Sequence, residues 1–97
     1  MPGTPDIEER VQAALAREQL TVTERWSNGP HAVYAEHEHP YGTVLYVLEG
    51  TIVFTLPATG ITRQLGPGDR LDVPPGTRHR AVAGPAGVVC VEAHQEP

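Results

Sequence analysis

Three histidines in this chain have the residue type and the spacing to hold a metal ion: His37, His39 and His79. Side chains alternate along a β-strand, so His37 and His39 point to the same face if they share a strand. His79 can converge on them from a neighbouring strand. Three neutral imidazoles around one point form a transition-metal site with open coordination positions. The spacing therefore predicts a metal centre inside a β-sheet structure.

Glycine and proline residues stand at fixed distances from these histidines, and their spacing resembles two motifs of the cupin superfamily. The motifs read Gly-x5-His-x-His-x3/4-Glu-x6-Gly and Gly-x5-Pro-x-Gly-x2-His-x3-Asn. Beside the histidines, the matching positions are Gly50, Gly68, Pro74 and Gly76, and the resemblance covers roughly residues 29–93. It implies an all-β fold of the cupin type, a double-stranded β-helix that closes into a jelly-roll barrel.

Three positions differ from these motifs: His31 replaces the opening glycine, Thr43 replaces the glutamate and Ala83 replaces the final asparagine. The change at Thr43 matters most, because threonine is a neutral and poor ligand that offsets no metal charge. A site of three histidines then resembles that of some cupin thiol dioxygenases in its ligand set only. Three imidazoles suit divalent Fe, Zn, Mn, Ni or Cu, so the sequence leaves the metal open.

A cavity beside the metal is implied by the same resemblance. We expect Thr43 to face this cavity and to contact water or substrate without binding the metal directly. Tyr41 lies in the loop between His39 and Thr43, which places it near the cavity mouth. The residues with the strand parity to line an apolar cavity are Leu45, Val47, Leu71 and Val73.

The remaining reactive side chains receive other predictions. His31 and His94 are interpreted as surface histidines, and Cys90 as a small buried apolar residue. Glu36 and Glu38 have the opposite parity to the histidine pair and should point away from the metal. No carboxylate has a clear inward position near the metal, which leaves the neighbouring hydroxyl groups as the only candidates for proton transfer.

The N-terminal segment predicts one amphipathic helix over about residues 5–18, with Thr4 as N-cap and Pro5 in the first turn. Its apolar stripe consists of Ile7, Val11, Ala14 and Leu15. This stripe should pack on the outside of a sheet or on a second subunit.

From residue 20 onward, short apolar segments separated by glycine and proline turns predict β-strands. The expected strands cover residues 21–26, 32–37, 44–48, 51–56, 61–65, 70–73, 79–82 and 88–93. Residues 49–50 and 84–87 are expected to form corners between strands. The whole chain, 1–97, is predicted to be one domain with its barrel at about 21–94.

Composition narrows the range of functions. The formal net charge of −5 comes with no basic face, which argues against a nucleic-acid partner. No apolar run is long enough to cross a membrane, and the N-terminus lacks a secretion-signal pattern, so we predict a cytoplasmic protein. A single cysteine excludes an intrachain disulfide. Small size favours a homodimer.

Three functional hypotheses follow. The first is a metalloenzyme that acts on a small anionic substrate through a divalent transition metal. The second is a non-catalytic module that binds or senses a small-molecule ligand in the barrel cavity. The third is a stable barrel that acts through its surface, with the helix supplying the face for a partner. The sequence leaves open whether the protein is an enzyme.

Overall fold

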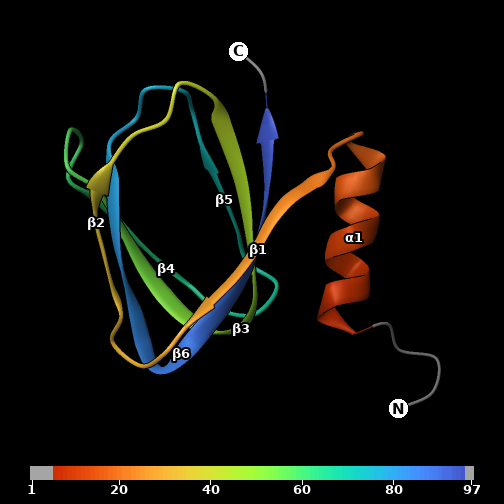
Figure 1. Cartoon of the computed structure of the whole chain (residues 1–97), viewed down its shortest axis with the longest axis horizontal. Coiled ribbons are helices and arrows are strands. Elements are labelled where there is room, and N and C mark those ends of the chain that lie inside the picture. The colour runs from red at the N-terminus through yellow and green to blue at the C-terminus, as the bar shows by residue number, and fades with distance from the viewer. Residues whose placement is uncertain (1–5, 96–97) are drawn as a thin grey trace.

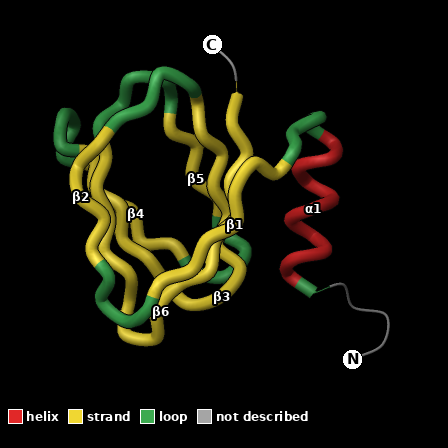
Figure 2. The backbone as a smooth tube through the Cα atoms, viewed as in Figure 1, coloured by secondary structure: helices red, strands yellow, loops and turns green. Residues whose placement is uncertain are grey.

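The computed structural model describes residues 6–95, and in this range one α-helix precedes six β-strands (Figure 1). Figure 2 shows the strands curving into a barrel, with the helix lying outside it. The elements are α1 (Ile7–Arg17), β1 (Val22–Asn28), β2 (Val33–His37), β3 (Gly42–Leu56), β4 (Ile61–Leu65), β5 (Arg70–Val73) and β6 (His79–Gln95). The expected all-β fold with one N-terminal helix is confirmed.

Two long strands, β3 and β6, form the frame of the barrel. They pair antiparallel from Gly42 opposite Gln95 to Thr55 opposite Arg80. The shorter strands β4 and β5 pair with β3, while β1 and β2 pair with β6, all antiparallel. Each long strand therefore bends through the barrel and holds shorter strands along its length.

The segments 49–50 and 84–87, predicted as corners between strands, do not end a strand, because both lie inside these long strands. The pairing is nevertheless irregular at these segments. Register shifts fall between Val47 and Glu49 and between Gly50 and Ile52, and the second shift leaves residues 84–87 of β6 between the partners Val88 and Ala83. Gly50 has φ +73°, and a Cβ there would lie 2.0 Å from the carbonyl oxygen of Gly87. The strands approach so closely that only glycine fits, which explains why the sequence resembles a turn at this point.

The side chains in the first part of β3, residues 42–48, alternate between two apolar layers, so this part of the strand is buried on both faces. Leu45 and Val47 point into the barrel, where they join an inner cluster that includes Cys90. Val44 and Tyr46 point outward into a second cluster beneath α1. This double burial explains the near-continuous apolar sequence of β3.

The helix begins at Ile7 and not at residue 5, and its N-cap is Asp6. The Asp6 Oδ1 atom accepts a hydrogen bond from the backbone N–H of Glu9 at 2.7 Å. The predicted cap Thr4 and the following proline lie outside the described residues. Val11 and Leu15 are buried against the outer face of the barrel. The apolar stripe therefore packs on the outside of a sheet, which is one of the two arrangements expected for it. Within residues 6–95, α1 is too short and too polar to cross a membrane.

Candidate metal centre

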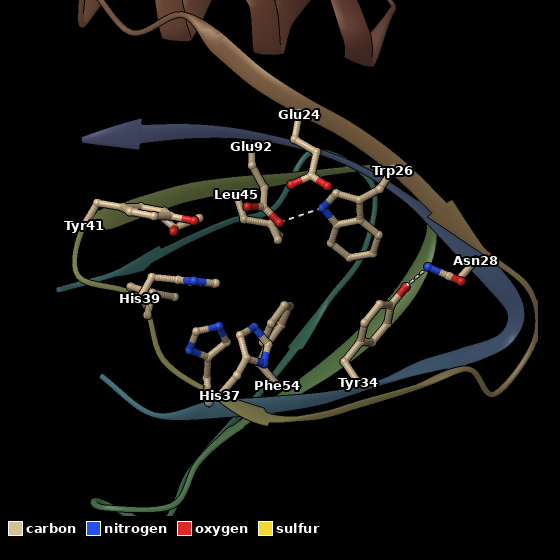
Figure 3. A pocket seen from close by; sticks show the side chains of 13 residues that line it. Glu24, Trp26, Asn28, Tyr34, His37, His39, Tyr41, Leu45, Phe54 and Glu92 are labelled. Atoms are coloured by element: carbon tan, nitrogen blue, oxygen red, sulfur yellow. Dashed lines mark hydrogen bonds between the residues drawn. The ribbon is translucent and has the colours of Figure 1, made fainter. Parts of the chain in front are cut away.

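The barrel brings the three histidines together at one end of β2 and β6. His37 is the last residue of β2 and pairs across the sheet with His79, the first residue of β6. His39 follows two residues after β2. One ring nitrogen from each of the three lies within 4.8 Å of the other two. We call these three residues the histidine wall; Figure 3 labels two of its members, His37 and His39.

A turn holds the loop that carries His39 in place. The backbone N–H of Gly76 donates a hydrogen bond of 2.8 Å to the carbonyl oxygen of His39. Gly76 has φ +72°, a backbone conformation that favours glycine. The turn before His79 is thereby tied to the segment after His37, which explains why glycine and proline stand at fixed distances from the histidines.

Backbone carbonyl groups orient two of the three imidazoles. The Nδ1 atom of His37 lies 2.7 Å from the carbonyl oxygen of Ala35, and the Nδ1 atom of His79 lies 2.9 Å from that of Thr77. A carbonyl oxygen only accepts, so each Nδ1 carries the proton and each Nε2 keeps a free lone pair. This is the arrangement by which a backbone group prepares an imidazole for metal binding.

Burial favours the neutral form of His79. Its side chain lies at the inner edge of the group and the residue is only 6% exposed. Desolvation lowers the pKa of His79, and the nearby His37 and His39 lower it further. Only the neutral imidazole can bind a metal, so the environment favours the ligating form of this residue.

A pocket of about 280 Å³ adjoins the histidine wall (Figure 3). Among its lining residues are Tyr41, Thr43, Leu45 and Val73, four of the side chains expected at a cavity. The other lining residues are Glu24, Trp26, Asn28, Tyr34, His37, His39, Phe54, His79 and Glu92.

Val47 and Leu71 are not among the lining residues, which corrects their prediction as cavity residues. Both are buried in the inner cluster of the barrel. Strand parity identified their inward direction correctly. Parity does not give the depth of a residue along the barrel, and these two side chains fill the core instead of the pocket wall.

Thr43 and Tyr41 contact the site in different ways. Thr43 is 6% exposed, and its Oγ1 atom has no hydrogen-bond partner among the described residues. The Tyr41 ring stacks on His39, with centroids 4.9 Å apart and planes at 11°. Its other neighbour is His94, at a centroid distance of 4.0 Å. Tyr41 therefore links His39 to His94.

Two carboxylates also line the pocket, which the sequence did not predict. Glu24 of β1 and Glu92 of β6 line it, and Figure 3 shows their carboxylate groups close together. Together with His94 they form a second group, whose ligand atoms lie within 4.8 Å of one another. We call Glu24, Glu92 and His94 the carboxylate wall.

Glu92 is held in place by a neighbouring strand. The indole N–H of Trp26 donates a hydrogen bond of 2.6 Å to Glu92 Oε2, and His94 Nε2 lies 3.7 Å from Glu92 Oε1. His94 is therefore partly buried beside Glu92, and it packs against Tyr41, a residue of the pocket, without lining the pocket itself. It is less exposed than the surface position that the sequence favoured. The alternation of Cys90, Glu92 and His94 along β6 was the available signal, because Cys90 faces inward.

The remaining polar predictions agree with the structure. His31 is exposed and occupies a turn with φ +59°. Glu36 and Glu38 point away from the histidines and pair with arginines, Glu36 with Arg78 at 2.7 Å. Burial raises the pKa of Cys90 to about 12, so this thiol is not a nucleophile at neutral pH.

Comparison with known proteins identifies the fold family. The sequence model of the family described as Cupin domain matches residues 25–92 of this chain. KdgF from Halomonas sp. is 29% identical, with a TM-score of 0.63 over 75% of this chain and 66% of that one. The polyketide cyclase RemF from Streptomyces resistomycificus is 32% identical, with a TM-score of 0.64 over 74% of this chain and 52% of that one.

A cupin superfamily protein from Desulfitobacterium hafniense is 25% identical, with a TM-score of 0.66 over 75% of this chain and 64% of that one. This chain thus spans about two thirds or less of the length of these solved proteins. No curated protein matches it. With a family match over most of its length, the chain belongs to the cupin superfamily.

Proposed function

We propose that this cupin binds one divalent transition metal through His37, His39 and His79 and acts as a metalloenzyme on a small molecule in the adjoining pocket. The observation that carries the proposal is the convergence of three imidazole nitrogens within 4.8 Å. Two of these rings are already oriented by backbone carbonyl groups. When bound, the metal supplies a Lewis acid with open positions for substrate.

The donor set fits a metal of intermediate softness. Imidazole ligands suit divalent Fe, Zn, Mn, Ni and Cu, and Thr43 stands where the cupin motif has a carboxylate. Three neutral ligands leave the divalent charge without compensation from the histidine wall. An anionic oxygen of the substrate therefore suits this end of the pocket.

The residues opposite the histidines supply the groups that an enzyme needs for proton transfer. Glu92 faces the pocket, and its side chain is only 15% exposed. Its Oε1 atom lies 3.7 Å from Nε2 of His94, which does not itself line the pocket, so Glu92 is the group that can exchange a proton with a bound molecule. The pocket volume of about 280 Å³ lies near the lower end for small-molecule sites and limits the substrate to a small compound.

A second candidate function is non-catalytic binding of a small molecule. The aromatic side chains of Trp26, Tyr34 and Phe54 favour it, because they form an apolar surface suited to ligand packing. Trp26 and Tyr34 pack against each other with centroids 5.1 Å apart. A binding module would show ligand-induced thermal stabilisation without turnover, whereas the enzyme would show both. RemF is a polyketide cyclase, so a cupin of similar fold can be an enzyme.

Oligomeric state and location stay predictions. The small size of the chain favours a homodimer. Light scattering at micromolar concentration checks it, and a monomer would contradict it. The cytoplasmic location and the absence of a nucleic-acid partner are likewise proposals from composition.

Cobalt substitution tests the proposed metal site. Metal-free protein titrated with Co(II) should develop visible ligand-field absorption that saturates at about one ion per chain. His79→Gln should abolish these bands, because it removes the most buried ligand. His31→Gln is the matched control, since His31 is exposed and in a turn, and it should leave the titration unchanged. Equal spectra for His79→Gln and the wild type would overturn the proposed site.

A further inference from the structure

The pocket contains two negative charges and no positive side chain. Among its lining residues are Glu24 and Glu92, but no arginine or lysine. Oxygen atoms of the two carboxylates lie within 4.8 Å of each other. Two anions at this distance repel each other, and the partial burial of Glu92 strengthens the repulsion, although Glu24 is exposed. The two carboxylates on this side of the pocket therefore lack an arginine or lysine to balance their charge.

Four arginines form ion pairs with carboxylates elsewhere, and none of them pairs with Glu24 or Glu92. Arg25 directly follows Glu24, yet it points outward and pairs with Glu8 of α1. Arg70 pairs with Glu18, and Arg78 pairs with Glu36. Within residues 6–95, no arginine forms an ion pair with Glu24 or Glu92. The basic group nearest to this pair among the described ion pairs is thus the imidazole of His94, 3.7 Å from Glu92.

A second observation, independent of the carboxylates, also indicates a ligand. The Oγ1 atom of Thr43 is buried and has no hydrogen-bond partner in the described part of the chain. Thr43 lines the same pocket and pairs across β3 and β6 with His94, a member of the carboxylate wall. A buried hydroxyl without a partner is costly, and a ligand in the pocket would supply the missing hydrogen bond.

The surroundings favour an organic cation over a second metal ion. Aromatic rings of Trp26, Tyr34 and Tyr41 line the pocket, and such rings attract cations through their faces. One oxygen of Glu92 already accepts the indole N–H of Trp26 and is less available as a metal ligand. An ammonium group has three N–H donors, which matches oxygens from two carboxylates and one hydroxyl.

We propose that the carboxylate wall, together with the Thr43 hydroxyl, binds a protonated amine, so that the ligand of this pocket is a small zwitterion. Its anionic oxygen faces the histidine wall and its ammonium group lies between Glu24, Glu92 and Thr43. The anionic end rests on the proposed metal function. The ammonium end rests only on the carboxylates, the hydroxyl and the aromatic rings.

Calorimetry with simple charged compounds tests the proposal. The zwitterions are glycine, β-alanine and γ-aminobutyrate, with acetate, propionate and butyrate as monoanions of equal carbon number and succinate as a dianion. On zinc-loaded protein, the best zwitterion should bind at least about tenfold tighter than its matching monoanion, the effect of one well-placed charged hydrogen bond. Succinate should bind more weakly than γ-aminobutyrate, because a carboxylate would face Glu24 and Glu92.

Two matched variants locate the preference. Glu92→Gln removes one charge but keeps an oxygen that can accept the indole N–H of Trp26. It should reduce the affinity for the zwitterion at least about tenfold and leave the affinity for the monoanion unchanged or higher. Glu49→Gln removes the same charge from an exposed position outside the pocket and should change neither. Circular dichroism confirms that both variants are folded.

Butylamine on metal-free protein separates this proposal from the metal function. Binding of butylamine that is lost in Glu92→Gln supports the ammonium site even if the protein holds no metal. The proposal is overturned if succinate binds as tightly as γ-aminobutyrate, or if no zwitterion binds better than its monoanion. It is also overturned if Glu92→Gln leaves that preference unchanged. Two metal ions per chain, falling to one in Glu92→Gln, would assign the carboxylate wall to a second metal instead.

Discussion

The two walls of the pocket differ in charge and in how they are held. The histidine wall is oriented by carbonyl groups two residues earlier in the same chain segment, from Ala35 to His37 and from Thr77 to His79. The carboxylate wall is charged, and its Glu92 is held by the indole of Trp26 on a neighbouring strand. Two imidazoles of the first wall are thus oriented by local backbone structure, although His37 and His79 are brought together by the pairing of β2 with β6. The second wall depends on the pairing of β1 with β6 and on a side-chain hydrogen bond between these strands.

This difference has a consequence for how the walls respond to mutation. A change in β1 should disturb the carboxylate wall and leave the histidine wall intact, because none of the three histidines lies on β1. The two walls can therefore be altered separately, even though they line one pocket of about 280 Å³.

The largest effect on stability is expected from Trp26→Phe. Phenylalanine keeps an aromatic ring but lacks the indole N–H that donates a hydrogen bond to Glu92. Loss of a hydrogen bond to a charged group should lower the free energy of unfolding by about 2 kcal/mol, measured by urea denaturation. Metal content should not change.

The control for this substitution is Tyr34→Phe, which also removes one polar group from the aromatic surface. The Tyr34 hydroxyl accepts a hydrogen bond from the side-chain amide of Asn28, which is exposed and uncharged. The loss in free energy of unfolding should therefore be smaller. Equal destabilisation by both changes would indicate that the bond to Glu92 does not hold the carboxylate wall in place.

Acidification should affect the histidine wall. The pKa of His79 is lowered in the folded protein, mainly by desolvation. Between that value and the ordinary value of about 6.5, the unfolded chain binds more protons than the folded protein. The contribution of neutral His79 to the free energy of unfolding is therefore fully present above about pH 6.5. It decreases as the pH falls below that value, by at most about 1.4 kcal/mol per pH unit.

Urea denaturation of metal-free protein at several pH values measures this effect. His79→Gln should flatten the dependence below about pH 6.5 relative to the wild type, because the titrating group is gone. His31→Gln should retain the wild-type dependence, since His31 is exposed. Identical pH profiles for the wild type and His79→Gln would rule out burial of His79 as the cause.

The smallest effect on stability is expected from Thr43→Val. This substitution tests whether the buried hydroxyl of Thr43 lacks a hydrogen-bond partner in the ligand-free protein. Valine has a similar shape and removes the buried hydroxyl without a partner. The free energy of unfolding of the ligand-free protein should rise by about 1 kcal/mol. Thr62→Val, at an exposed position of β4, should change it little. A loss of stability in Thr43→Val would show that the hydroxyl is satisfied in the folded protein.

The grouping of the histidines was predicted from two sources, which are the alternation along a strand for His37 and His39 and the resemblance to the second cupin motif for His79. Two histidines separated by one residue share a face, and the turn around Gly76 joins the third to them. The same alternation identified Leu45 and Val73 as pocket residues. The inferences from alternation need only the geometry of a strand.

The carboxylate wall could not be predicted in the same way. Glu24 meets Glu92 through the pairing of β1 with β6, between residues far apart in sequence. A register shift between Val22 and Glu24 also changes the simple alternation on β1. The strands were predicted to end at 49–50 and 84–87, but they continue through both segments. Glycine is needed there because two bent strands approach closely, and the sequence cannot distinguish this use of glycine from a turn.

The central claim is that the histidine wall binds the metal and the carboxylate wall does not. Elemental analysis of protein purified without a histidine tag tests it directly, beside His37→Ala/His79→Ala and Glu92→Gln. We predict about one metal ion per chain in the wild type and in Glu92→Gln, and none in the double histidine variant. The account would be contradicted if the wild type held no metal after incubation with Fe(II), Zn(II) or Mn(II), or if the double variant held as much as the wild type.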